Sequence, residues 1–357
     1  MMFSPATESP EMGVILEAVS KTYGRVQVLQ PTGLEVADGE FLTILGPSGS
    51  GKTTILRMIG GFVQPSSGRI LFDGADVTGL PPHKRPFNTF FQDYALFPHM
   101  SVAENVAYGL RVRGMGRAEA RARAAETLDL VGLSGMLERR PAQLSGGQRQ
   151  RVALARTIIC EPKLVLLDEP LSALDAELRH HMQGFLKDLQ RRLATTFLFV
   201  THDQEEAITM ADRIVVMSQG RIEQVGPPRA LYYAPKTPFV ARFFGDNNLV
   251  EARVEDGQVQ CALGALPLPE GVSATPRKIL VALRPEQILL SGGARRVEGH
   301  LVDVTFAGAV TTLTATVGGH ELLVKMASGA NPALPAPGER ITLGFDPAAV
   351  ALVEIAP

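Results

Sequence analysis

Continuous apolar runs alternate with turn residues along the first two thirds of the chain. The runs at residues 164–167 and 197–200 are apolar throughout and the run at 41–45 is apolar except for Thr43, as expected of parallel strands covered on both faces. Further runs are also predicted to be strands, at residues 14–19, 28–36, 69–72, 213–217 and 221–225, and residues 88–91 form a short apolar stretch that ends at Gln92. Helical patterns separate several of these strands, so this region is predicted to be an α/β domain.

Helix starts can be read from capping residues. Ser101 and Glu104 form a capping-box pattern, and residues 117–130 are charged and alanine-rich, with arginines that favour a solvated helix face. Asp175 is expected to cap the next helix. Its apolar positions recur at helical spacing, at Leu178, Met182, Phe185, Leu186, Leu189 and Leu193. Gly184 lies inside this helix and should cost up to ~1 kcal/mol relative to alanine.

The pattern changes after residue 233, where prolines and Gly245 mark a junction. Short strands separated by glycine and proline turns follow, which is typical of an all-β, barrel-like module. The predicted strands are residues 250–254, 258–262, 278–283, 287–290, 300–306, 310–317, 321–325 and 340–345.

Composition limits the classes that remain. The chain has 357 residues, 45% hydrophobic and 20% charged, so we expect a folded protein of about two domains. A net charge of −2 gives no overall basic footprint for nucleic acid. Cys160 and Cys261 lie far apart, form no metal-ligand spacing, and are expected to be ordinary thiols in a reducing cytoplasm.

Neither a signal peptide nor a membrane span is expected. Residues 1–12 contain Glu8 and Glu11 and have no apolar signal core. No run of about 18 apolar residues occurs, so any membrane role is expected to come through partners.

A phosphate-binding loop follows the apolar run at residues 41–45. The sequence GPSGSGKT, residues 46–53, fits G-x-x-x-x-G-K-[ST] and leads into a predicted helix at residues 54–59. Its glycines allow backbone N–H groups to form an anion nest, and the helix N-terminus adds a positive dipole end. Lys52 can reach the β- and γ-phosphates and Thr53 can bind Mg²⁺. A plain glycine-serine turn with a solvated lysine is the alternative.

Two further strand ends carry reactive side chains. Asp168 and Glu169 follow the buried run at residues 164–167, where an ATPase needs an acid for Mg²⁺ and a base for water. A surface turn is the alternative reading, but it fits poorly after a buried strand. His202 follows the run at residues 197–200, at the strand edge where ligands gather in α/β sheets.

A second candidate anion site lies at Leu144-Ser145-Gly146-Gly147-Gln148. This stretch opens a predicted helix at residues 149–159, so its backbone N–H groups can face an anion. A simple helix N-cap is the alternative for these residues taken alone.

Aromatic residues allow two interpretations at two places. Tyr23 precedes the phosphate-binding loop and could stack on a base or simply pack. Tyr94, Leu96 and Phe97 follow Gln92 and could belong to a core or to a docking surface for another protein.

These motifs, in this order, resemble those of the ATP-binding subunits of ABC importers. The resemblance covers nearly all of residues 13–357, and the LSGGQ stretch at residues 144–148 separates this family from other P-loop NTPases. The tail, with Arg284-Pro285-Glu286, is similar to the C-terminal β (TOBE-type) domain of the maltose- and spermidine/putrescine-importer ATPases. Residues 88–110 and 213–227 look most like the spermidine/putrescine branch, while the ATPases of ferric-iron, sugar, sulfate and phosphonate importers share much of this sequence.

The resemblance implies a fold and its bounds. We expect an α/β P-loop NTPase with a RecA-like core and a helical subdomain, plus a C-terminal all-β OB-like domain. The ATP-binding domain is expected at residues 13–234, with its helical subdomain at about 93–160. A linker at 235–248 and the β domain at 249–357 would follow.

The resemblance also implies the roles of individual residues. Glu169 would polarise the attacking water, with His202, Lys52 and Gln92 as further catalytic groups. Mg²⁺ would be organised by Thr53, Gln92 and Asp168. ATP would be held by Tyr23 on adenine, by the phosphate-binding loop and, from a second copy, by the LSGGQ stretch: Gly46, Pro47, Ser48, Gly49, Ser50, Gly51, Lys52, Thr53, Thr54, Ser145, Gly146, Gly147, Gln148 and Asp175.

The implied partners are a second copy of the chain, transmembrane permease subunits and, indirectly, an extracytoplasmic solute-binding protein, with no nucleic acid. The implied location is the cytoplasmic face of the inner membrane. Two other classes compete: a soluble ABC ATPase of translation or DNA repair, and a small-molecule kinase. The first usually carries two cassettes or a long coiled coil, and the second leaves LSGGQ and the β tail unexplained. The β tail could widen the dimer interface, which we favour, or bind a regulator or the transported solute and so modulate hydrolysis.

Overall fold

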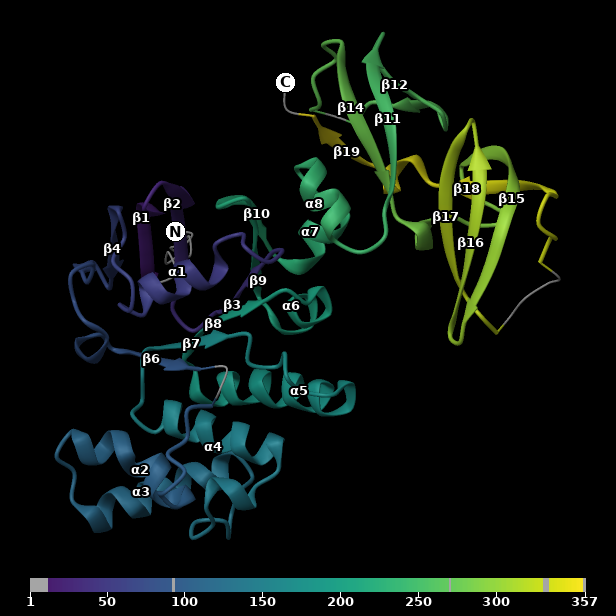
Figure 1. Cartoon of the computed structure of the whole chain (residues 1–357). Coiled ribbons are helices and arrows are strands. Elements are labelled where there is room, and N and C mark those ends of the chain that lie inside the picture. The colour runs from purple at the N-terminus through teal and green to yellow at the C-terminus, as the bar shows by residue number, and fades with distance from the viewer. Residues whose placement is uncertain (1–11, 92–93, 270, 330–333, 356–357) are drawn as a thin grey trace, which may run out of the picture. The chain divides into compact units, whose positions relative to one another are not determined.

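The computed structural model describes residues 12–91, 94–269, 271–329 and 334–355. The chain divides into two compact units, the first ending at Val225 and the second beginning at Gly226. Figure 1 shows the helices and strands of both.

A six-stranded sheet forms the centre of the first unit, in the order β10-β9-β3-β8-β7-β6. The strands from β9 to β6 in this order pair in parallel. All of its strands except β6 lie on runs predicted to be strands, so those predictions are confirmed, and β6 lies on the short apolar stretch before Gln92. The bounds are β3 Phe41–Leu45, β6 Phe87–Phe90, β7 Leu164–Asp168, β8 Thr196–Thr201, β9 Arg213–Ser218 and β10 Arg221–Gly226.

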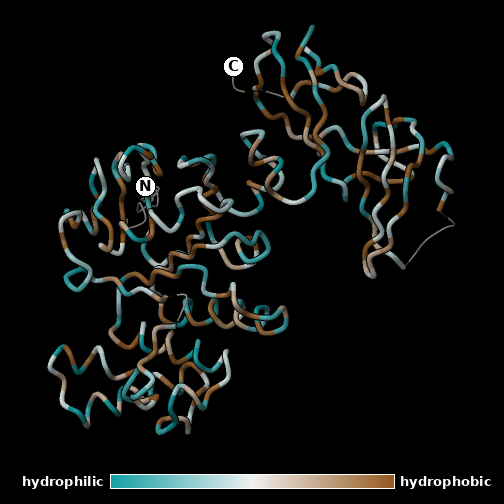
Figure 2. The backbone as a smooth tube through the Cα atoms, in the orientation of Figure 1, coloured by the Kyte–Doolittle hydropathy of each residue, from teal (hydrophilic) through white to brown (hydrophobic). Residues whose placement is uncertain are grey.

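The inner strands β3, β7 and β8 are buried on both faces of this sheet, and their alternate residues enter different cores. Leu42 and Ile44 face a cluster that contains α1 (Lys52–Ile59) and the antiparallel sheet β2-β1-β4-β5. Phe41 faces the opposite cluster, which contains α4 (Gly146–Ile158) and α5 (Ala176–Leu193). Figure 1 shows α1 and α5 on opposite sides of the strands, and Figure 2 shows the hydrophobic residues that run along them. The antiparallel strands are β1 Met12–Tyr23, β2 Val26–Ala37, β4 Ser67–Phe72 and β5 Ala75–Asp76.

Helices α2 (Val102–Val112) and α3 (Arg117–Leu130) pack with α4 below the sheet in Figure 1. Ser101 caps α2, and its hydroxyl accepts from the backbone N–H of Glu104 while the Glu104 carboxylate accepts from the Ser101 N–H. The predicted capping box is therefore confirmed. The remaining helical segments of this unit are α6 Gln204–Met210 and the 3₁₀ turns Pro82–Lys84 and Pro141–Gln143.

Helix α5 begins where its sequence predicts. Asp175 is the N-cap, and its carboxylate accepts from the backbone N–H of Leu178 at 2.9 Å. Met182, Leu186 and Leu189 are buried against the core, which confirms the apolar face. Gly184 lies on the exposed side, and a Cβ built there would meet no heavy atom within 4 Å among the described residues.

The second unit contains the helices α7 (Pro228–Tyr233) and α8 (Pro238–Phe243) and two antiparallel sheets over one core. The sheet orders are β13-β12-β11-β14-β19 and β17-β16-β15-β18. The side-chain amide of Asn248 joins them by exchanging hydrogen bonds with the backbone of Leu323. The strands are β11 Asn248–Glu255, β12 Gln258–Cys261, β13 Gly264–Pro267, β14 Arg277–Leu283, β15 Arg295–Ala307, β16 Val310–Val317, β17 His320–Ala327, β18 Arg340–Phe345 and β19 Ala351–Glu354.

One predicted strand of this unit, at residues 287–290, is wrong. Pro285 begins a 3₁₀ turn that extends to Gln287, and only Leu289 makes an isolated bridge, to Gly344. Proline fixes φ and lacks an N–H, so it favours the first position of such a turn over a ladder. The 3₁₀ turn Pro347–Ala349 precedes β19, a strand that the apolar pattern does not reveal.

Arg284 anchors α7 and α8 to the strands of this unit. Its guanidinium is buried and donates to the backbone carbonyls of Tyr232, Phe244 and Asp246. It also lies 3.7 Å from the centroid of the Tyr232 ring, and the Tyr232 hydroxyl donates to Glu286 at 2.9 Å. Arg284 and Glu286 of the Arg-Pro-Glu element thus make hydrogen bonds that hold this unit together.

Within the described part of the chain, no helix combines the length and the apolar character needed to cross a membrane. Cys160 and Cys261 are free and half-buried, and burial raises the pKa of both thiols. This agrees with the expectation of ordinary thiols.

Candidate functional site

The carboxyl ends of the parallel strands place three predicted motifs at one edge of the central sheet. Leu45, the last residue of β3, pairs with Thr201 at the end of β8, and Asp168 at the end of β7 pairs with Val200. The phosphate-binding loop, the acidic pair and His202 therefore follow neighbouring strand ends. Ligands bind at this edge in open α/β sheets.

The phosphate-binding loop has the backbone that an anion nest requires. Gly49 and Gly51 have φ values of 80° and 99°, a left-handed region that side chains with a Cβ rarely adopt. Gly51 is the N-cap of α1 and no side chain caps this helix. The first N–H groups of α1 are therefore available to phosphate oxygens.

Two polar side chains in this loop point to an anionic ligand. The Lys52 ammonium donates to the carbonyls of Gly46 and Pro47, at 2.8 and 3.0 Å, and burial lowers its pKa. The buried Ser50 hydroxyl has no hydrogen-bond partner among the residues that the structure describes. Phosphate oxygens would satisfy this hydroxyl and give the buried ammonium a negative partner.

Thr53 and Asp168 meet across the site. The Thr53 hydroxyl donates to the Asp168 carboxylate at 2.9 Å. Burial raises the pKa of Asp168, and the Thr53 hydrogen bond opposes that rise. A hydroxyl and a carboxylate beside a phosphate site are the oxygen ligands that Mg²⁺ prefers, together with substrate phosphate and water. Three or more His, Cys, Asp or Glu residues gather at no place in the described chain to make an all-protein metal cage.

Glu169 has an unusual backbone conformation. Its φ is 44°, and its N–H donates to the carbonyl of Val200 at 3.0 Å, so the chain turns sharply as it leaves β7. Such a conformation costs about 1–3 kcal/mol and is concentrated at functional sites. The turn brings a Glu169 carboxylate oxygen to 3.3 Å from Nδ1 of His202.

Gln92, expected to act in catalysis and at the metal, lies outside the described residues. Tyr23, expected to stack on adenine, is half-exposed near the end of β1, with the Lys21 ammonium 4.9 Å from the centre of its ring. One aromatic ring is thus accessible to solvent at this end of the antiparallel sheet.

The LSGGQ stretch begins α4, as predicted, and Ser145 is its N-cap. The Ser145 hydroxyl accepts from the Gln148 N–H at 3.3 Å, and the Gln148 side chain accepts from the Ser145 N–H. Ser145 is exposed and Gly147 is buried. The side chains of Ser145 and Gln148 therefore act as a helix N-cap, and the N-terminus of α4 begins at an exposed residue.

The two candidate anion sites lie on opposite faces of the central sheet. Lys52 begins α1, whose apolar residues belong to one core, and Ser145 caps α4, whose apolar residues belong to the other. Figure 1 shows the sheet between these helices.

Tyr94 and Leu96 pack against the core of α2 to α4, so the core reading applies to them. Tyr94 and Ala95 have φ values of 59° and 45°, and their carbonyls accept from Arg156 on α4, at 2.8 and 2.7 Å. Phe97 lies with its ring centroid 4.7 Å from that of Tyr108.

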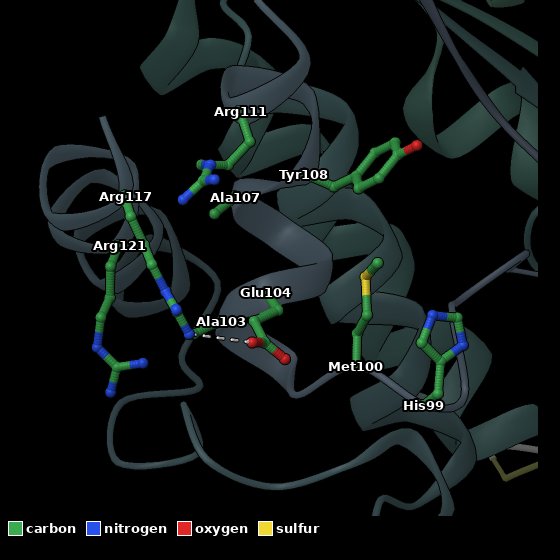
Figure 3. A pocket seen from close by; sticks show the side chains of 9 residues that line it. All are labelled: His99, Met100, Ala103, Glu104, Ala107, Tyr108, Arg111, Arg117 and Arg121. Atoms are coloured by element: carbon green, nitrogen blue, oxygen red, sulfur yellow. Dashed lines mark ion pairs between the residues drawn. The ribbon is translucent and has the colours of Figure 1, made fainter. Parts of the chain in front are cut away.

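Two cavities lie next to this loop. One, of about 390 Å³, includes Arg57, Asp168 and the exposed rings of Phe62 and Phe91, which pack edge to face at 5.6 Å. The other cavity has a volume of about 560 Å³, and Figure 3 shows three arginines of α2 and α3 along one side of it. Its lining residues are His99, Met100, Ala103, Glu104, Ala107, Tyr108, Arg111, Arg117 and Arg121.

A polar layer lies beneath His202 that no motif in the sequence marks. The Thr201 hydroxyl donates to the buried Glu206 carboxylate at 2.5 Å and accepts from the Asp203 N–H at 3.0 Å. Arg179 of α5 lies 3.5 Å from the Asp203 carboxylate and 3.8 Å from that of Glu206. These side chains come from two helices and a strand end, so only tertiary structure brings them together.

Family models match both units. The model described as "ABC transporter" matches residues 29–172, and the model described as "TOBE domain" matches residues 281–353.

Full-length relatives are similar throughout. The spermidine/putrescine import ATP-binding protein PotA of Acidothermus cellulolyticus is 46% identical, over 94% of this chain and 92% of that protein. The uncharacterized ABC transporter ATP-binding protein YdcT of Escherichia coli is also 46% identical, over 93% of this chain and 95% of that protein.

Solved structures match about three fifths of the chain. The ATP-binding cassette MJ0796, described as a dimeric post-hydrolysis state bound to ADP and Pi, is 33% identical with a TM-score of 0.55. The match covers 60% of this chain and 99% of the cassette. The protein cbiO1 of Clostridium perfringens, described as part of the ABC transporter complex cbiONQ, is 29% identical with a TM-score of 0.58, covering 62% and 90%.

Proposed function

The chain belongs to the ABC transporter family as an ATP-hydrolysing import subunit with a TOBE domain, and we propose that it energises the uptake of polyamines such as spermidine or putrescine. The observation that carries the substrate proposal is the 46% identity, across more than nine tenths of both chains, to a relative named for spermidine/putrescine import. Uptake of ferric iron, a sugar, sulfate or phosphonate is the alternative, since the solute contacts belong to other subunits.

The geometry supports specific roles in hydrolysis. Lys52 and the glycine-rich loop hold the β- and γ-phosphates, and Tyr23 stacks on adenine. Thr53 and Asp168, with Gln92, would hold Mg²⁺, which would supply positive charge at the phosphates. Glu169 accepts a hydrogen bond from the attacking water and so polarises it. His202, with Nδ1 3.3 Å from a Glu169 carboxylate oxygen, orients that water and the γ-phosphate.

A second copy completes each site in this proposal. Ser145 and the backbone of Gly147 begin a helix on the other side of the sheet from Lys52, so one chain offers its two anion sites to different nucleotides. Two copies arranged head to tail pair each phosphate-binding loop with the partner's LSGGQ helix. The solved cassette described as dimeric supports the pairing of two copies.

The permease is proposed to dock beside the loop that follows Gln92. Exposed Phe91 comes directly before Gln92, and the exposed ring of Phe62 packs against that of Phe91. The arginine-rich cavity of Figure 3 is lined in part by His99 and Met100, which come after the loop. Exposed aromatic rings with arginines nearby are complementary to an amphipathic permease helix that carries carboxylates. A subunit docked in this way lies on the cytoplasmic face of the membrane.

Nucleotide binding is assigned to residues 13–234 and the β domain to residues 249–357.

The test is transport in proteoliposomes that contain this subunit, its permease and the matching solute-binding protein. We expect ATP-dependent uptake of labelled spermidine or putrescine, and stimulation of ATP hydrolysis by the loaded binding protein. Uptake of iron, sugar, sulfate or phosphonate instead would overturn the polyamine assignment and leave the import role. Stimulation by ribosomes or DNA, with none by the permease, would overturn the import role.

A further inference from the structure

We propose that Arg179 is a positioning residue for ATP hydrolysis, which fastens residues 172–175 to residues 201–203 and thereby holds His202 against Glu169. The proposal rests on the roles proposed above for Glu169 and His202. Arg179 contacts no phosphate in this scheme and acts through the backbone segments that it joins.

The first set of contacts is to the segment that follows Glu169. Arg179 donates from Nη2 to the carbonyl of Leu174 at 3.1 Å, and this carbonyl lies between Ser172 and the helix cap Asp175. The Ser172 hydroxyl donates to the carbonyl of Glu169 at 2.9 Å. A continuous chain of contacts thus leads from Arg179 to the backbone that carries the proposed base.

The second set is to the segment that carries His202. Nη1 of Arg179 lies 3.5 Å from Oδ2 of Asp203, whose other carboxylate oxygen caps α6 by accepting from two backbone N–H groups. Nε lies 3.8 Å from Oε1 of Glu206, and the other oxygen of Glu206 accepts from Thr201 at 2.5 Å. Both neighbours of His202 are therefore tied to Arg179, directly or through one carboxylate.

Burial makes this arrangement costly to break. Glu206 is 3% exposed, and burial raises the pKa of its carboxyl. The Nε of Arg179 is buried and has no hydrogen-bond partner among the described residues, so its guanidinium needs the nearby carboxylates. A guanidinium can contact a carbonyl and two carboxylates at once because its donors form a planar fork. A lysine ammonium in its place would reach fewer of them.

A small cavity separates the two segments, with Glu169, His202 and Arg179 among its lining residues. Its volume of about 30 Å³ leaves room for only a water molecule or two. A movement of either segment would change this space, and with it the 3.3 Å separation of His202 from Glu169. We infer that Arg179 limits that movement.

The experiment is a double-mutant cycle on ATP hydrolysis by the full chain, with Arg179→Met, His202→Ala and the double variant. Arg179→Met should lower kcat about 10-fold or more and leave KM for ATP within about 2-fold, because a positioning group acts on the reacting geometry. In the His202→Ala background the same substitution should have little further effect, because the residue through which it acts is gone. Arg179→Lys should recover part of the loss, and Arg191→Gln near the end of α5 is the control.

Independent losses in the double variant would overturn the proposal, as would a rise in KM with kcat unchanged. If Arg179→Met does not fold, Thr201→Val replaces it in the cycle, since this change removes the link from Glu206 to the residue before His202. A wild-type chain without ATPase activity would contradict the family assignment itself, and full activity of His202→Ala would contradict the role of His202. These results are distinguishable from a failure at Arg179 alone.

Discussion

Nδ1 of His202 lies 3.3 Å from a carboxylate oxygen of Glu169. The two residues follow different strands, and they meet because β7 and β8 pair in parallel with Asp168 opposite Val200. The left-handed φ of Glu169 then turns its side chain back toward the end of β8. A carboxylate and an imidazole at this distance can share the orientation of one water molecule.

Replacing Glu169 with glutamine should separate binding from turnover. The amide keeps the shape of the side chain but is a much weaker base, so we expect ATP affinity within a few-fold of wild type and kcat lower by about 100-fold or more. Equilibrium nucleotide binding and phosphate release measure the two quantities. Glu205→Gln, on the exposed side of α6, is the control and should keep full turnover. Near-normal hydrolysis by Glu169→Gln would contradict the base assignment.

Asp168→Asn should stabilise the nucleotide-free protein while it abolishes Mg²⁺-dependent hydrolysis. Burial raises the pKa of Asp168, so its folded form binds a proton more tightly than its unfolded form. The ionised carboxylate therefore destabilises the fold once the pH exceeds the unfolded value of about 3.9. Calorimetry should show a higher unfolding midpoint for the variant at pH 7, with a gain that shrinks as the pH falls through the folded pKa. A lower midpoint at pH 7 would contradict this reasoning.

Mixtures of two inactive variants should regain activity if each site is shared between copies. Lys52→Ala removes the phosphate-binding ammonium. Ser145→Asp keeps a good helix cap and places a negative charge near the partner's triphosphate. A mixed dimer contains one intact site, made from the loop of one variant and the helix of the other. Activity of the mixture above the sum of the separate variants is expected, and its absence would favour a site within one chain.

Reversing charge in the cavity of Figure 3 should uncouple the subunit from its permease. Arg111→Glu would repel permease carboxylates, so we expect loss of permease-stimulated ATPase and of uptake. Basal hydrolysis should stay near wild type because Arg111 is not in the nucleotide site. Arg123→Glu changes an exposed arginine of α3 that does not line this cavity, and it should have little effect on either activity. Equal loss from both variants would contradict the docking surface.

Gly184→Ala should stabilise the first unit. The site is an exposed position inside α5 with open space around the added methyl group, so only helix propensity changes, by ~1 kcal/mol or less. Denaturant unfolding of this unit gives the measurement. Gly109→Ala in α2 is a matched control, because its Cβ would lie 2.7 Å from Sγ of Cys160 and the contact should offset the gain. A destabilised Gly184→Ala would show that the glycine has another role.

Local signals predicted much of the fold. Apolar runs identified the strands of the central sheet because buried parallel strands need both faces apolar, and capping residues such as Ser101 and Asp175 identified helix starts because only certain side chains satisfy exposed N–H groups. The wrong strand at residues 287–290 arose from apolar composition alone, where Pro285 imposes a 3₁₀ turn instead.

The motifs that bind phosphate are contiguous, so residue types and spacing in the sequence by itself were enough to identify them and their class of chemistry. The tertiary structure alone decided which side chains lie around them. Pairing of β7 with β8 places Glu169 beside His202, and packing of α5 against α6 places Arg179 between Asp203 and Glu206. Contacts between residues that are distant along the chain depend on how the elements pack, and no local sequence pattern encodes that packing.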